Sequence, residues 1–151
     1  MSGPHVLERV WVNRLVSLAL FLITGFVLGL SLYLDPSPAG HGTHTQLGLN
    51  GCTFLTWTDY PCPMCGMTTT FSLMAHGRFG EAVLNQPMGV VLFLVTSVVF
   101  VLSLIELVRP RFVWKSLWRL TLRFELRLVV LVLLGLLGGW AYKIWEMASR
   151  Y

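Results

Sequence analysis

The sequence predicts an all-α integral membrane protein, with three transmembrane helices and a structured, cysteine-rich loop outside the cytoplasm that carries short helices. Only 12% of the 151 residues are charged and 55% are hydrophobic, whereas soluble domains contain about 25% charged residues. Apolar runs occur three times, each close to the roughly 20 residues that a membrane-spanning helix needs. This composition excludes a soluble globular domain, a disordered chain and a small disulfide-dense secreted protein.

The apolar runs define the expected organisation of the chain. Residues 15–34 form the first expected span. Residues 87–107 form the second, with Pro87 at its start, where proline suits a first helical turn. Residues 128–146 form the third, in which Lys143 can extend its amine towards the membrane surface. The remaining segments are an N-terminal tail at 1–14, a loop at 35–86, a basic segment at 108–127 and a C-terminal tail at 147–151.

Basic residues predict the orientation, because Lys and Arg concentrate in the cytoplasmic loops of membrane proteins. The 108–127 segment is rich in Lys and Arg, whereas the 35–86 loop contains only Arg78. We therefore expect the N-terminus and the 108–127 segment inside the cell, and the 35–86 loop outside it.

A basic stripe follows one side of the expected helix in the 108–127 segment, because Lys or Arg recurs at every fourth position. Aromatic and aliphatic residues lie between these charges. The pattern predicts an amphipathic helix on the anionic lipids of the cytoplasmic leaflet, although charges that only set topology give the same pattern. We expect no nucleic-acid partner, since the net charge of +4 comes with no binding motif. The stripe consists of Arg111, Lys115, Arg119, Arg123 and Arg127.

All three cysteines of the chain lie in the 35–86 loop, so we expect its function there. The first part of the loop, residues 35–51, is rich in Pro and Gly and predicts irregular backbone. Cys52 is followed by a Cys-x-x-Cys pair, Cys62 and Cys65, after which helical spacing resumes. We therefore expect this pair at a helix N-terminus, where free N–H groups and the helix dipole lower the pKa of a thiol.

Three uses of the cysteines fit this pattern. In a metal site, Cys52, Cys62 and Cys65 would be joined by His44 as a fourth ligand, for zinc or, with the neighbouring methionines, for copper(I). In a thiol–disulfide oxidoreductase, Cys62 would be the nucleophile and Cys65 the resolving thiol, but no thioredoxin-like βαβ pattern surrounds them. In a purely structural loop, one disulfide would leave one thiol over. We favour the metal site, because it uses all three thiols.

The sequence favours a non-catalytic role for the protein, as an accessory or assembly subunit of a membrane complex. It contains no Ser/His/Asp set, no phosphate loop and no cofactor fingerprint. The expected partners are membrane lipid and other membrane subunits or further copies of the chain. Two GxxxG pairs, Gly25 with Gly29 and Gly135 with Gly139, provide faces on which helices can approach closely.

The loop also resembles a known family. Its markers are Cys52-x-Phe54, Cys62-Pro-Met-Cys65-Gly-Met-Thr68, His76-Gly-Arg-Phe79 and Asn85-Gln-Pro87. Together they are similar to an uncharacterised bacterial family of small membrane proteins with a Cys-Pro-x-Cys-Gly-x-Thr motif, known as a domain of unknown function. The resemblance runs from about Asp35 to Leu92. It implies a bacterial cytoplasmic membrane and no established activity.

One position departs from that family. Many members have Arg after the motif threonine, whereas this chain has Thr69. A role that depends on that arginine therefore does not carry over to this protein.

Overall fold

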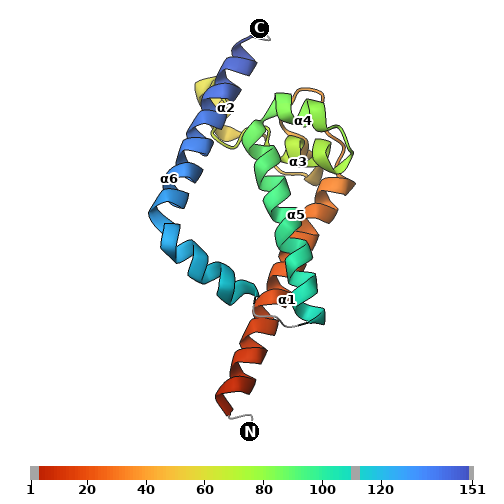
Figure 1. Cartoon of the computed structure of the whole chain (residues 1–151). Coiled ribbons are helices and arrows are strands. Elements are labelled where there is room, and N and C mark those ends of the chain that lie inside the picture. The colour runs from red at the N-terminus through yellow and green to blue at the C-terminus, as the bar shows by residue number, and fades with distance from the viewer. Residues whose placement is uncertain (1–3, 110–112, 150–151) are drawn as a thin grey trace.

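The computed structural model describes the backbone of residues 4–109 and 113–149, and the side chains of residues 11–109 and 126–149. The regular secondary structure of this part of the chain is all helical, as the sequence predicts, with no strand. Three long helices form most of the molecule, and four short ones gather towards one end of it (Figure 1). The elements are α1 (Pro4–Tyr33), the 3₁₀ helix η1 (Thr43–Leu47), α2 (Thr53–Thr58), α3 (Met67–Ala75), α4 (Phe79–Asn85), α5 (Pro87–Val108) and α6 (Val113–Ala148).

Three stretches of the long helices are long and apolar enough to cross a membrane. They are Trp11–Tyr33 in α1, Pro87–Val108 in α5 and Leu126–Ala148 in α6. Large apolar side chains along all three are exposed, as expected of helices whose surroundings are lipid rather than water. The protein is therefore an integral membrane protein by its fold.

The first two spans pack side by side, whereas the third diverges from them. Phe21 of α1 stacks on Phe100 of α5 with 4.9 Å between ring centroids. Gly25 lies so close to the same ring that an added Cβ would be 3.0 Å from it. The α6 helix meets α5 at Met88, near the start of α5. Figure 1 shows α6 bowing away from α5 in its middle, with its first turns coming back towards α1. The side chains of residues 126–134 are all exposed.

The two GxxxG pairs do not behave alike. In α6, both Gly135 and Gly139 face Met88, with added Cβ atoms only 3.0 Å from its side chain. In α1, only Gly25 is close to another helix, and an added Cβ on Gly29 would meet nothing within 4 Å. Three of the four glycines therefore serve contacts between helices of the same chain.

The loop between the first two spans is more helical than the sequence predicts. We expected irregular backbone over residues 35–51, but η1 lies within it, and α2 follows without a clear sequence signal. Both are single short turns of helix, and they end in left-handed backbone at Gly48 (φ 75°) and Asp59 (φ 57°). Periodicity does not detect helices of five or six residues, because they complete less than two turns.

The α3 and α4 helices form a small core against α1 and α5. Leu73 and Met74 of α3 and Ala82 of α4 are buried together, and Val90 and Phe93 of α5 pack against them. Phe71 meets Phe93 edge to face with 5.4 Å between centroids. These contacts fix the cysteine-bearing turn before α3 against the membrane-spanning helices.

Candidate functional site: a pocket with three thiols

The three cysteines occupy two neighbouring turns of the loop. Cys52 is the N-cap residue of α2. Cys62 and Cys65 form a tight turn, in which the Cys65 N–H donates to the Cys62 carbonyl at 2.9 Å. Gly66 follows as the N-cap of α3 with φ 83°, a left-handed conformation that glycine adopts without a steric penalty. The Cys-x-x-Cys pair thus immediately precedes a helix.

Cys52 and Cys62 lie close enough for each thiol to shift the pKa of the other. Both are free and partly exposed. Burial opposes ionisation of Cys52, but the Leu55 backbone and the Cys62 side chain donate hydrogen bonds that outweigh it and lower the pKa of Cys52. Burial and the same contact raise the pKa of Cys62. As the pH rises, Cys52 therefore loses its proton before Cys62 does.

Cys65 lies deeper than the other two thiols. It is 5% exposed. Burial and repulsion from Cys62 and Cys52 raise the pKa of Cys65 to about 11, although the nearby Lys143 ammonium partly offsets this. The lowered pKa that we expected for Cys62 and Cys65 is therefore wrong. Burial and the repulsion between neighbouring thiolates outweigh the helix dipole here.

A cavity of about 650 Å³ opens beside the three thiols. Its walls come from the loop before η1, from η1, from α2 and from the turn that leads into α3. The lining groups combine sulfur atoms, imidazoles and hydroxyls, including His41, His44, Cys52, Cys62, Met64, Cys65, Met67 and Thr68. The four ligands predicted from the sequence therefore line one cavity.

The cavity does not hold these ligands as a closed cluster. Among the described residues, no group of three or more His, Cys, Asp or Glu side chains is close enough together to hold a metal ion. His44 instead places its Nε2 atom 3.2 Å from the Asn50 carbonyl. Cys65 or His44 would have to move towards the Cys52–Cys62 pair to complete a coordination sphere.

A buried polar cluster that the sequence did not reveal supports one wall of the pocket. The Asn85 amide donates to the Gly66 carbonyl at 3.1 Å and to Thr70 Oγ1 at 2.9 Å. Lys143 Nζ donates to Asn85 Oδ1 at 2.8 Å and to the Gly40 carbonyl at 3.3 Å. The cluster joins α6, α4, the turn after Cys65 and the loop before His41.

We expected Lys143 to extend its amine towards the membrane surface, but its side chain is buried within the protein. It is 1% exposed and pairs with Glu146 at 3.0 Å. The sequence contained one signal for this pairing, since Lys143 and Glu146 stand one helical turn apart in an apolar span, where ionisable residues usually have partners. The loop partners, Asn85 and Gly40, could not be identified without the fold.

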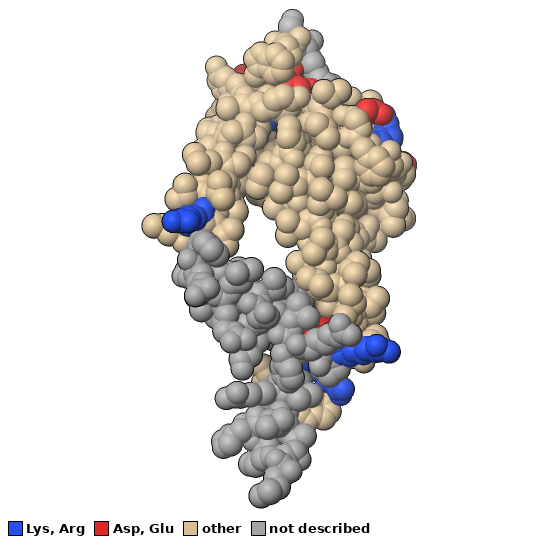
Figure 2. All heavy atoms as spheres, in the orientation of Figure 1, with Lys and Arg blue, Asp and Glu red and all other residues tan. Residues whose placement is uncertain are grey.

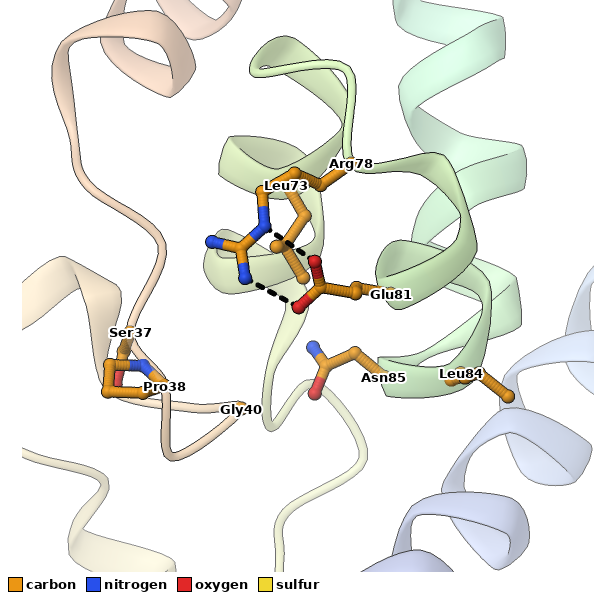
Figure 3. A pocket seen from close by; sticks show the side chains of 8 residues that line it. All are labelled: Ser37, Pro38, Gly40, Leu73, Arg78, Glu81, Leu84 and Asn85. Atoms are coloured by element: carbon orange, nitrogen blue, oxygen red, sulfur yellow. Dashed lines mark hydrogen bonds and ion pairs between the residues drawn. The ribbon is translucent and has the colours of Figure 1, made fainter.

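A second, smaller cavity of about 140 Å³ also has Gly40 and Asn85 of this cluster in its wall (Figure 3). Asn85 and Leu84 lie along it from α4, and Ser37 and Pro38 from the loop. Arg78 and Glu81 pair beside it, with Arg78 Nε 2.7 Å from Glu81 Oε1. Because these two charges satisfy one another, they leave no free charge for a ligand.

The predicted basic stripe lies mostly outside the described side chains. The side chains of Arg111, Lys115, Arg119 and Arg123 are not described, and Arg127 is exposed. The backbone of α6 is helical from Val113 onward, so this segment is continuous with the third span. Lipid binding by the stripe stays a prediction.

These features define a small helical membrane protein with a thiol-lined pocket in the loop between its first two spans. Residues 52–100 match the model of a family described as a protein of unknown function (DUF2752). The matched segment begins at Cys52 and covers the three cysteines, α3, α4 and most of α5, so the similarity centres on the pocket. No curated protein and no solved structure matches the chain.

Proposed function

We propose that this protein is a non-catalytic accessory subunit of a bacterial membrane complex, and that its loop binds a soft metal ion, zinc or copper(I). Cys52 and Cys62 would be the first ligands, Cys65 the third and His44 the fourth. The observation that supports this proposal is the gathering of all three thiols of the chain around one cavity. Thiolates and thioethers are the ligands that these ions prefer.

The pKa values of the thiols add a physical reason. Repulsion between neighbouring thiolates contributes to the raised pKa values of Cys62 and Cys65. A bound cation removes this repulsion and replaces the protons, because metal-bound thiols are deprotonated. The site is therefore expected to bind metal more tightly as the pH rises, with protons competing increasingly below the pKa of each thiol.

The test is a metal titration of the full chain, purified in detergent with its thiols reduced. We expect about one equivalent of zinc or copper(I) per chain, with affinity falling by about tenfold or more in C52S, C62S and C65S, because each loses a ligand. M64L is the matched control: it leaves the three thiols in place, so zinc affinity should not change, and a loss of copper(I) affinity would identify copper as the ion. Equal binding by the wild type and the three serine variants would refute the metal site.

The proximity of Cys52 and Cys62, each of which shifts the pKa of the other, favours one alternative function, a thiol–disulfide oxidoreductase. The two thiols would give two electrons and two protons to a disulfide of a partner protein, forming a Cys52–Cys62 bond and two partner thiols. Cys52 would be the attacking thiolate, because its pKa is lowered and that of Cys65 is raised.

Thiol counting on the same protein separates the two functions. A redox protein would bind no metal, and its free thiols would fall from three to one on oxidation and return on reduction. The C65S variant would cycle normally, whereas C52S would not. A disulfide that resists reduction in the native protein would instead indicate a purely structural loop.

A further inference from the structure

The second and third spans are offset along their length. They run in opposite directions, and α6 extends past the start of α5 (Figure 1). An added Cβ on Gly139 would lie 3.0 Å from Cβ of Met88, which is the second residue of α5. Gly139 and Met88 are therefore at about the same level, and α6 continues to Ala148, which is roughly 14 Å further at 1.5 Å per residue.

The loop lies beside this extension rather than beyond it. The Trp140 indole N–H donates to the Pro61 carbonyl at 2.7 Å, and the Tyr142 hydroxyl donates to the Leu84 carbonyl at 2.7 Å. Both α6 residues belong to the apolar span Leu126–Ala148. A bilayer that covers this span therefore reaches the level of the loop. Lipid would then meet the face of the loop that does not contact α6.

The exposed surface of α2 has the composition of a membrane interface. We call Phe54, Trp57 and Tyr60 the aromatic patch; they are 44%, 85% and 59% exposed. The α2 helix contains no charged residue, and its exposed C-cap, Asp59, is the one carboxylate between Trp57 and Tyr60. Trp and Tyr are favoured at the level of lipid headgroups, where an apolar ring and a polar tip are both solvated. Figure 2 shows a surface that is mostly uncharged, with a few acidic and basic side chains at the end of the molecule that carries the loop.

We infer that the aromatic patch is inserted among lipid headgroups, so that the loop sits in the interfacial layer of the bilayer. The partner of this surface is lipid, and a docking protein is the alternative that the experiment tests. The α2 helix also contributes Leu55 and Thr56 to the wall of the thiol pocket. The same short helix therefore separates the pocket from the lipid, and the pocket opens at headgroup depth. This inference does not depend on what the thiols bind.

The experiment measures tryptophan quenching in the full-length chain, reconstituted in phosphatidylcholine vesicles. One set of vesicles contains lipids brominated near the headgroup, and aqueous iodide is the opposing quencher. The difference in fluorescence between the wild type and W57F gives the emission of Trp57. W145F gives a matched reference, because Trp145 is 65% exposed on the spanning helix α6.

We expect brominated lipid to remove about half or more of the Trp57 emission, as for a residue in the headgroup layer, and iodide to remove little. The Trp145 emission should respond in the same way. Quenching of Trp57 by iodide but not by lipid would overturn the inference and leave a water-exposed patch suited to a protein partner. Failure of lipid to quench Trp145 would also overturn it, because the offset between the spans would then not place this level in the bilayer.

Discussion

Replacement of Asn85 by alanine tests whether the buried cluster behind the pocket holds the loop to the third span. The substitution removes the two hydrogen bonds that the amide donates, to the Gly66 carbonyl and to Thr70 Oγ1. It also removes the oxygen that accepts from Lys143 Nζ at 2.8 Å. Lys143 keeps its ion pair with Glu146 at 3.0 Å, so the variant does not leave a buried charge without a partner.

The magnitude follows from the kinds of bond lost. A neutral hydrogen bond contributes about 1 kcal/mol, and one to a charged group about 1.5–3 kcal/mol. Asn85 is 3% exposed, so water cannot replace the lost partners without reorganisation. Because the three bonds share one side chain, their contributions do not simply add. We expect N85A to reduce the free energy of unfolding by about 3 kcal/mol.

The assay is denaturant unfolding of the protein in detergent micelles, followed by helical circular dichroism. N50A is the matched control: Asn50 is exposed in the same loop, and only its backbone carbonyl is near a polar partner, His44. This control should change stability by less than about 0.5 kcal/mol. If N85A and N50A unfold at the same denaturant concentration, the cluster does not hold the loop and our reasoning is wrong.

Two further predictions concern the thiols and the turn that presents them. The first is measured by alkylating the reduced protein and following each cysteine by mass spectrometry. Cys52 should be modified at the lowest pH, because thiolate is the reactive form and the pKa of Cys52 is lowered. Cys65 should react slowly until the pH approaches its pKa of about 11. Fast alkylation of Cys65 at pH 8 would contradict its burial. G66A should destabilise the protein by about 1–3 kcal/mol in the same unfolding assay, since Gly66 has φ 83° and an added Cβ would lie 2.7 Å from the Gly40 carbonyl; wild-type stability would show that the turn can relax.

Much of the fold could be predicted because long apolar runs are a strong signal. A membrane core accepts only backbone whose hydrogen bonds are satisfied within the segment, so such a run predicts a helix directly. Pro87 at the start of α5 was similarly informative, because proline restricts the backbone to a conformation that suits a first helical turn.

The site could be predicted only in part. The sequence identified the three cysteines and His44, and all four line one cavity. It did not identify Cys52 as the thiol with the lowered pKa, because that depends on the Leu55 backbone N–H at the start of α2 and on the Cys62 side chain, ten positions away. Nor did it assign the thiols their burial, since the depth of Cys65, which is 5% exposed, depends on how the folded loop packs. Spacing along the chain indicates which groups are near one another, but not which are shielded from water.

The Lys143–Asn85 contact has a consequence for the order in which the molecule is assembled. Lys143 follows Asn85 by 58 positions, so the loop with its cysteines is synthesised and leaves the membrane insertion machinery before the third span exists. During that interval the Asn85 side chain lacks its cationic partner. Insertion of the third span is then the step that completes the buried cluster behind the pocket, so that a chain interrupted before it would lack the Lys143 contacts that join the loop to α6.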